Sequence, residues 1–371
     1  MKTLLKNANL WMPDHSFSLG ADVLICDGII ADISKDINAD ADKIIDLDGN
    51  YLIPGFVDVH THGRVGYDFN TASKEQMMVM KRSYIENGVT SVFPTLASDT
   101  LDGWKKSLKN ISDCDFDGIH LEGRYLSEKR RGAHAPHLLA PPDFDEVDNM
   151  LCGINSPIHI SIAPELSGGY EFIKRAVDKG MTVGIAHTSA TADEARKALS
   201  LGAKSFTHLF NGMNPMHHRE GGAVCAALTS NAYCELIVDG LHICPDMVAL
   251  AYFCVGKDKF VLVTDSMAGA GCPDGKYSIA GQGVQVIDGR ALTPDGALAG
   301  SILDMLTAMK NLMKFTGATL GDAVACATKN PAEMVGIYNK VGSVEVGKVA
   351  NMVVLDKELC IKSVICTGEV I

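Results

Sequence analysis

The sequence predicts a (β/α)8 barrel joined to a small β-sandwich domain that is built from both ends of the chain. Eight short, β-rich apolar runs recur through the middle of the 371-residue chain, and helix-like stretches separate most of them. The two ends instead carry only short strands and turns. Eight β/α units over roughly 290 residues have the number and size of a (β/α)8 barrel, in which the strands are buried and the helices form an outer ring.

The eight apolar runs are the expected barrel strands. Segments between them, such as SKEQMMVMKRSYIENG and YEFIKRAVDKG, have apolar residues three and four positions apart and end in Gly, which is typical of helices. A further hairpin is expected at 277–296, after the eighth run. The runs are IPGFVDVHTH (53–62), VTSVFPTL (89–96), FDGIHLEG (116–123), PIHISIAPE (157–165), MTVGIAHTS (181–189), AKSFTHLFN (203–211), YCELIVDG (233–240) and KFVLVTDS (259–266).

The chain ends are expected to form a unit of their own. Residues 1–52 and 342–371 both have the pattern of short strands with turns. Neither end has enough strands to enclose a core, so we expect the two to pack together as one small β-sandwich beside the barrel. The expected division is a first sandwich part at 1–53, the barrel at 54–341 and a second sandwich part at 342–371.

Net charge and cysteine usage restrict the classes of partner. The formal net charge is −12, so no broad basic surface is available for nucleic acid or an anionic membrane, and an anionic ligand must be held by a local cluster. The 11 cysteines show no CxxC spacing and no signal peptide is recognisable, so we expect reduced thiols in a cytoplasmic protein. The longest apolar run, MVALAYFCVG, is too short to span a bilayer.

Side chains that bind metals gather where the expected strands end. Barrel enzymes carry their active sites at the C-terminal ends of the strands, and histidines scattered through a core would not favour one end. Imidazole and carboxylate groups suit zinc or a similar divalent ion. The strand ends carry His60 and His62 (first strand), Glu122 (third), His187 (fifth), His208 (sixth) and Asp265 (eighth).

Other histidines have simpler explanations. His120 shares a strand face with Glu122 and lies one layer deeper, so we expect a core or supporting role for it. His159 lies in the middle of a strand and is also expected in the core, and His15 has no expected role. Asp265 has an alternative role as a helix N-cap in TDS, but capping does not explain its alignment with the other strand ends.

Eight motifs along the chain resemble one family. PGFVDVHTHG, HLEGRYLS, RRGAHAPH, IAHTSA, THLFNGMNPMHHRE, DGLHI, VTDSMAGAG and LAGS are together similar to the N-acetylglucosamine-6-phosphate deacetylases of the amidohydrolase superfamily. The similarity covers essentially the whole chain, and THLFNGMNPMHHRE is its most specific part. The resemblance implies that the chain hydrolyses a linear amide, releasing acetate from N-acetyl-D-glucosamine 6-phosphate.

The resemblance also implies a metal site. Some members of the family hold a second ion and others work with one, so the number of ions, one or two per subunit, stays open. Zinc is the expected ion, with iron, manganese and cobalt as alternatives. The fourth strand offers no lysine for a carbamylated bridge, which leaves a glutamate as the expected bridge. The implied roles are Glu122, His187 and His208 for the first ion, His60 and His62 for the second, and Asp265 as the catalytic carboxylate.

The resemblance further implies contacts with the sugar phosphate. Arg219 would hold the phosphate together with His242, which would reach in from a neighbouring subunit of a homodimer. A guanidinium offers paired donors for phosphate oxygens. His217 is explained equally well as a flanking polar residue and as a substrate contact. The remaining expected contacts are His134 and the backbone around Asn211 and Gly212 for the sugar or acetyl group, and Leu298, Ala299 and Gly300 around the acetyl methyl.

Three positions depart from the family pattern. Arg124 and Gly221 stand where Pro is usual, and Gly212 stands where Ala is common. They remove no catalytic group but leave the sugar epimer open, so N-acetylgalactosamine 6-phosphate is an alternative substrate. Two wider alternatives are another amidohydrolase reaction, such as cyclic-amide hydrolysis, and a non-catalytic sugar-phosphate-binding protein. The missing lysine and the expected phosphate contacts argue against the first, and the intact ligand set argues against the second.

Overall fold

Eight parallel strands follow one another in chain order around a barrel in the computed structural model, which describes residues 1–371. A parallel bridge between Thr61 and Ser266 joins the last strand to the first at their C-terminal ends. Each of the eight predicted runs contains one strand, so the (β/α)8 prediction is confirmed. The strands are β6 (Phe56–Thr61), β9 (Val89–Ala97), β10 (Ile119–Glu122), β11 (Ile158–Ile162), β12 (Thr182–Ile185), β13 (Ser205–Phe206), β14 (Tyr233–Ile237) and β15 (Phe260–Val263).

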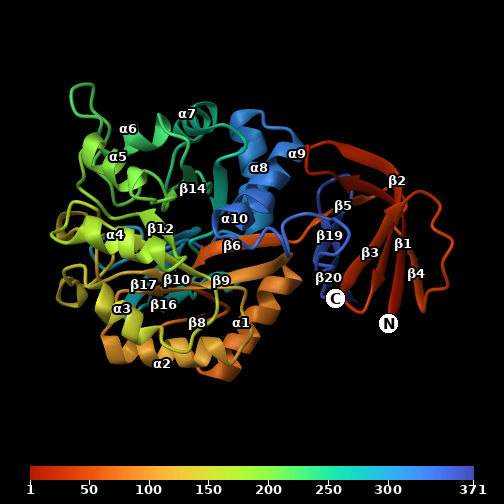
Figure 1. Ribbon diagram of the computed structural model, residues 1–371, viewed down its shortest axis with the longest axis horizontal. Coiled ribbons are helices and arrows are strands. Elements are labelled where there is room, and N and C mark those ends of the chain that lie inside the picture. The colour runs from red at the N-terminus through yellow and green to blue at the C-terminus, as the bar shows by residue number, and fades with distance from the viewer.

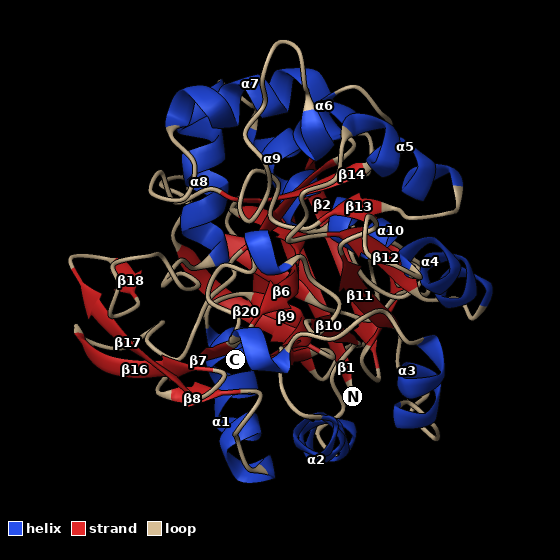
Figure 2. Cartoon of the chain, turned by 90° about the vertical axis from the view of Figure 1, so that its left-hand side faces the viewer, coloured by secondary structure: helices blue, strands red, loops and turns tan.

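Helices surround the strands, as Figure 2 shows with the strands in the centre. The first of them begins after Ser73, whose side chain accepts a hydrogen bond from the Gln76 N–H in a capping box. Both predicted helical segments are confirmed by α1 and α4. The helices are α1 (Lys74–Glu86), α2 (Leu101–Ser112), α3 (Phe144–Met150), α4 (Gly169–Asp178), α5 (Ala192–Ser200), α6 (Gly222–Leu228), α7 (Pro245–Val255), α8 (Met305–Thr316), α9 (Leu320–Ala327) and α10 (Lys329–Met334), with 3-10 turns at Glu128–Arg130 and Pro136–Leu138.

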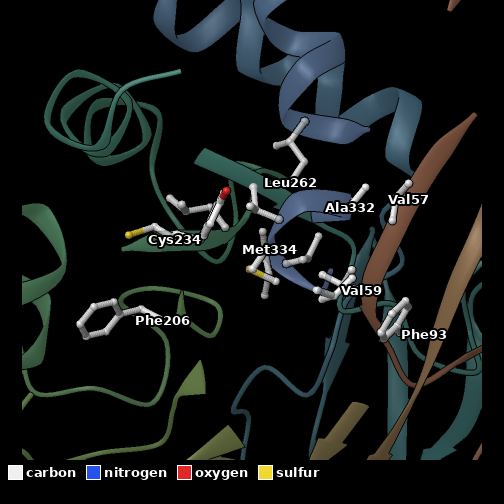
Figure 3. Packing of buried hydrophobic residues seen from close by; sticks show 14 of the residues in the cluster. Val57, Val59, Phe93, Phe206, Cys234, Leu262, Ala332 and Met334 are labelled. Carbon is white, nitrogen blue, oxygen red and sulfur yellow. The ribbon is translucent and has the colours of Figure 1, made fainter. Parts of the chain in front are cut away.

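The two faces of each barrel strand have different surroundings. Figure 3 shows Val57 and Val59 of β6 packed near Ala332 and Met334 of α10, in the apolar layer between strands and helices. Because successive side chains of a strand point to opposite faces, the alternate residue His60 faces the interior of the barrel. The apolar core therefore lies outside the strands, and the interior is free to hold polar groups.

Strands from both ends of the chain form a separate sheet, on the right of Figure 1, where the two termini also lie. The prediction that both ends build one small β unit is confirmed. The unit is a single continuous sheet that closes on itself, since the Ile30 N–H donates to the Lys348 carbonyl at 2.9 Å. The first strand has an irregularity in its register between Leu5 and Ala8, and such irregularities bend a strand. Its strands are β1 (Lys2–Trp11), β2 (Phe17–Cys26), β3 (Ile29–Ser34), β4 (Lys43–Asp46), β5 (Tyr51–Pro54), β19 (Met352–Leu355), β20 (Ile361–Cys366) and β21 (Glu369–Val370).

Two small features complete the fold. The hairpin expected at 277–296 is part of a three-stranded antiparallel sheet of β16 (Gly275–Ile279), β17 (Gln282–Ile287) and β18 (Arg290–Leu292), and β7 (Gly63–Arg64) pairs with β8 (Tyr67–Asp68). His15, for which the sequence indicated no role, joins the end sheet to the barrel through Asp322, with Nδ1 and Oδ1 2.7 Å apart. None of the helices has the length and apolar character needed to cross a membrane.

Candidate metal centre and active site

Side chains from five strand ends meet at one end of the barrel and are buried there. Three of them follow their strands in the left-handed region of backbone space, with φ of 41° at His187, 31° at His208 and 47° at Asp265. Non-glycine residues adopt this conformation rarely, and such strained positions concentrate at functional sites. The sharp turns bring the predicted group together: His60, His62, Glu122, His187, His208 and Asp265.

Glu122 lies between two pairs of histidines, and each of its oxygens faces a different pair. Oε1 is 2.7 Å from His208 Nε2 and 3.2 Å from His187 Nε2, and these two nitrogens are 3.2 Å apart. Oε2 is 3.1 Å from His62 Nε2 and 3.4 Å from His60 Nε2, and these nitrogens are 3.3 Å apart. The four imidazoles and the carboxylate thus form two triangles that share Glu122.

The size of both triangles fits a divalent metal. Ligands at about 2.0–2.2 Å from an ion in tetrahedral geometry are separated from each other by about 3.4 Å. The edges of 3.1–3.4 Å on the His60 side are close to that value. Those of 2.7–3.2 Å on the His187 side are shorter and would have to widen slightly around an ion. Each triangle therefore has donor types and spacings that could hold a divalent ion, and Glu122 belongs to both triangles.

Asp265 lies on the side of the His60 and His62 pair. Its Oδ1 is 3.2 Å from His62 Nε2 and 3.6 Å from His60 Nε2. Burial opposes its charge, but the neighbouring histidines lower the pKa of Asp265 to about 2. Asp265 is therefore an ionised carboxylate at neutral pH, which is the state of a proton acceptor.

The same contacts act on the two histidines. Burial opposes a charge on His62, but Asp265 and Glu122 outweigh it and raise the pKa of His62 to about 9. The pKa of His60 is likewise raised well above its ordinary value, against burial, by Glu122 and Asp265. With no ion bound, the pair consequently holds protons near neutral pH.

A second polar layer lies beneath this cluster, inside the barrel. His120 and His159 stack there with their ring centroids 4.3 Å apart, in line with the core positions expected for them. Glu235 of β14 lies in the same layer, with Oε1 2.9 Å from His159 Nε2, and was not singled out by the sequence analysis. Burial opposes its charge, yet His159 and His60 lower the pKa of Glu235 to about 2. A carboxylate inside the buried strand YCELI was the signal that could have revealed it.

The expected contacts for sugar and acetyl lie around the cluster. His134 is buried with Nε2 3.7 Å from Glu122 Oε2, and burial lowers its pKa to about 3, which leaves the ring neutral. The segment containing Leu298, Ala299 and Gly300 runs beside Asp265, where the Ser301 N–H donates to the Asp265 carbonyl at 2.7 Å. The Asn211 N–H donates to the His208 carbonyl at 2.9 Å, so Asn211 directly follows the cluster.

Arg219 and His242 lie in different surroundings. His242 is half-buried, with Nδ1 2.6 Å from Asp239 Oδ2; burial opposes its charge, but Asp239 chiefly, and Asp265 further off, raise its pKa. Arg219 is exposed on the loop after β13 and lines a cleft of about 620 Å³ together with the start of α5. That cleft shares no residue with the cavity of about 30 Å³ at His62 and Glu122. Arg219 and the metal cluster therefore line separate cavities in the single chain. Within the loop, His217 Nδ1 accepts a hydrogen bond from the Arg219 N–H at 3.3 Å.

All three departures from the family pattern have structural consequences. Arg124, with φ of 57°, donates from Nε to Glu146 Oε1 at 3.0 Å and so ties the end of β10 to α3. Gly212, with φ of 62°, approaches His187 so closely that a Cβ there would lie 2.5 Å from the ring Nδ1. Gly221 has a φ of −67° that would also suit Pro, but a Cβ there would lie 2.3 Å from Cys225 Cβ, so glycine leaves room for the first turn of α6.

The barrel and its buried cluster of histidines around one carboxylate define a metal-dependent enzyme of the (β/α)8 class. The model of the amidohydrolase family matches residues 51–371, and the chain belongs to this family. It is 32% identical over 369 residues to an N-acetylgalactosamine-6-phosphate deacetylase of Escherichia coli O157:H7, covering 97% of this chain and 95% of that one.

Two further relatives point the same way. The chain is 34% identical over 350 residues to an N-acetylglucosamine-6-phosphate deacetylase of Bacillus subtilis (strain 168), covering 91% of this chain and 87% of that one. The crystal structure of N-acetylglucosamine-6-phosphate deacetylase from Pasteurella multocida superimposes with a TM-score of 0.94 at 30% identity, covering 100% of both chains.

Proposed function

We propose that the protein is a metal-dependent deacetylase that hydrolyses N-acetyl-D-glucosamine 6-phosphate to D-glucosamine 6-phosphate and acetate, as a step in amino-sugar use. The observation that carries this proposal is the placement of Glu122 between two histidine pairs, with the ionised Asp265 beside one of them. The named activities of the relatives support the substrate class. N-acetylgalactosamine 6-phosphate is the second candidate, because a relative of nearly full coverage carries that name.

We assign the metal ligands from the two triangles. Glu122, His187 and His208 would hold the first ion, and His60 and His62 would hold a second ion with Glu122 as the bridge. Zinc fits the imidazole and carboxylate donors best, with iron, manganese or cobalt as alternatives. Bound metal lowers the pKa of a water molecule and polarises the acetyl carbonyl.

The protein's own groups would move the proton and orient the substrate. Asp265 accepts a proton from the attacking water and delivers it to the departing nitrogen, acting first as base and then as acid. His134, kept neutral by burial, orients the sugar or acetyl group from beside Glu122. Leu298, Ala299 and Gly300 wall the acetyl methyl next to Asp265, and the backbone of Asn211 and Gly212 meets the sugar.

Arg219 and His242 would bind the phosphate in a homodimer. Large apolar side chains are exposed on the same region of the chain: Met216 on the Arg219 loop, Leu241 beside His242, and Leu250 and Phe253 on α7, the last of them 87% exposed. A second copy of the chain would cover them. The family resemblance implied that His242 crosses between subunits. We infer instead that Arg219 crosses, because Asp265 of the same chain contributes to the raised pKa of His242, whereas Arg219 lines a cleft separate from the cluster.

We further propose the division of the chain into 1–53, 54–341 and 342–371, with the activity in the middle segment. All the proposed ligands and contacts lie between β6 and the start of α8. The 11 cysteines are unpaired, which supports a place in the reducing cytoplasm.

An acetate-release assay on a panel of sugar phosphates, with metal quantified in the same sample, tests the proposed function. We expect the highest kcat/KM on N-acetyl-D-glucosamine 6-phosphate. Arg219→Ala should lower kcat/KM on the 6-phosphate by about 10²-fold and on the unphosphorylated sugar much less, because only the phosphate uses the guanidinium. An equal loss on both sugars would refute the phosphate contact.

Mixed dimers identify the residue that crosses. Arg219→Ala chains mixed with Asp265→Asn chains should regain activity if Arg219 crosses, since one hybrid site then contains both intact residues. His242→Ala chains mixed with Asp265→Asn chains should stay inactive in that case. Rescue only in the second mixture would restore His242 as the shared residue.

A further inference from the structure

The barrel interior beneath the metal ligands holds polar side chains where (β/α)8 barrels usually pack branched apolar ones. His120, His159 and Glu235 are all completely buried there. Buried polar groups destabilise a protein unless each finds a hydrogen-bond partner. Each side-chain oxygen of a charged residue at this depth therefore needs a hydrogen-bond partner.

Only one of the two oxygens of Glu235 has hydrogen-bond partners within the lower polar layer. Oε1 lies 2.9 Å from His159 Nε2 and accepts from Ser205 Oγ at 3.3 Å. Oε2 is buried and has no hydrogen-bond partner. It faces His60 Nδ1 at 3.5 Å, and that nitrogen is also buried without a partner. A potential donor, His60 Nδ1, and an acceptor, Glu235 Oε2, thus face each other across the boundary between the two layers, and neither has another partner.

The other nitrogen of His60 points at the metal cluster. Nε2 is 3.4 Å from Glu122 Oε2 and 3.6 Å from Asp265 Oδ1. A histidine that binds an ion through Nε2 is neutral and carries its proton on Nδ1. In this ring, Glu235 Oε2 lies 3.5 Å from the nitrogen that would carry that proton.

We propose that Glu235 is a positioning residue for the second metal ion: its Oε2 accepts the Nδ1 proton of His60 and so fixes the tautomer and ring orientation in which Nε2 faces the ion. This inference rests on the proposed two-ion site. It concerns one ion only, because His187 Nδ1 lies 2.7 Å from the Arg130 carbonyl and His208 Nδ1 has no partner. A carboxylate behind a metal-binding histidine typically contributes 10–100-fold to metal affinity, and we expect about that effect here.

Glu235→Gln tests the proposal, because the amide has nearly the same shape but no charge. Its single carbonyl oxygen can accept from His159 or from His60, not from both. We expect the Kd of the second ion to rise about 10–100-fold and the Kd of the first ion to change less than about threefold. Ser161→Ala is the matched control: Ser161 lies in the same buried layer, 2.8 Å from His120 Nε2 and from Thr207 Oγ1, and its removal should leave both Kd values unchanged.

The measurement is a titration of the metal-free protein with zinc against a chelator of known affinity, with circular dichroism as a check on folding. Should Glu235→Gln fail to fold, the double variant Glu235→Gln/His159→Gln removes both partners of the buried pair and leaves no charge alone. A second readout uses the wild-type protein. In its zinc-loaded form labelled with 15N-histidine, NMR should detect a proton on His60 Nδ1 that exchanges slowly, and this signal should be absent from His60→Gln.

The outcomes separate this inference from the proposed function. Two ions in the wild type with an unchanged second Kd in folded Glu235→Gln would overturn the role of Glu235 and leave the two-ion deacetylase intact. Equal weakening of both ions would also overturn it, since Glu235 would then support the layer as a whole. A wild-type protein that takes up one ion while releasing acetate would overturn both the second site and its support, but not the deacetylase.

Discussion

At the proposed two-ion site, protons and the second metal ion would compete for the same nitrogens, so pH is the most direct perturbation of the site. The pKa of His62 is raised to about 9 in the metal-free protein, and that of His60 is raised in the same direction. A histidine must lose its proton before it binds a metal. The pH of 7 lies two units below the pKa of His62. Displacing the His62 proton alone therefore lowers the affinity for the second ion about 10²-fold, or by about 2.7 kcal/mol. The affinity for the second ion should therefore rise about tenfold per pH unit from pH 7 towards 9.

The stability of the metal-free protein should change in the opposite sense. A histidine whose pKa is raised on folding stabilises the fold fully below its unfolded pKa of 6.5, and this contribution is lost as the pH rises through the folded value of about 9. For the buried His62 the contribution is about 3 kcal/mol. The metal-free Tm should fall between pH 7 and 9.5 while metal affinity rises over the same range.

Calorimetric titrations of zinc in buffers of different ionisation enthalpy measure both the affinity and the protons released. At pH 7 we expect one to two protons released for the second ion, and fewer as the pH rises through 9. The variant His62→Gln serves as the control, since its metal-free Tm should depend less on pH. A second-ion affinity that changes less than about threefold from pH 7 to 9, with no proton release, would refute the competition.

Three further predictions address single groups. Asp265→Asn should lower kcat at least about 10²-fold while elemental analysis still finds the metal, and near-normal turnover in the fully loaded variant would contradict its role as base. Changing both His60 and His62 to Gln should lower bound metal from about two to about one ion per chain, and an unchanged count would make the pair structural. Gly212→Ala should lower stability by about 1–2 kcal/mol and weaken the first ion, because its Cβ would lie 2.5 Å from His187 Nδ1; an unaltered first-ion Kd would argue against that close approach.

The barrel and most of the candidate site could be predicted from the sequence, because both depend on local patterns. Each apolar run is a strand, and the residues that follow these strands meet because parallel strands share one C-terminal edge. Glu235 could not be predicted in this way, because it lies inside an apolar run and not at its end, and because its partner His60 is distant in the chain. The single continuous sheet at the chain ends was also beyond local patterns, because its closure depends on hydrogen bonds between residues near positions 30 and 348.

The charge of the buried cluster makes the number of bound metal ions depend on the number of protons that the cluster holds. Glu122, Asp265 and Glu235 are three buried carboxylates, and the raised pKa values of His60 and His62 mean that two protons balance much of this charge when no second ion is bound. One divalent ion carries the same charge as those two protons. The second ion can therefore replace them with little change in the net charge of the interior, which spares the large electrostatic cost that an uncompensated buried charge would impose. When the protons leave, His60 keeps one on Nδ1, and Glu235 is the group in position to accept it. In the proposed two-ion site, Glu235 and the His60–His62 pair would therefore act together: the pair would give up protons to the second ion, and Glu235 would hold the one that His60 keeps.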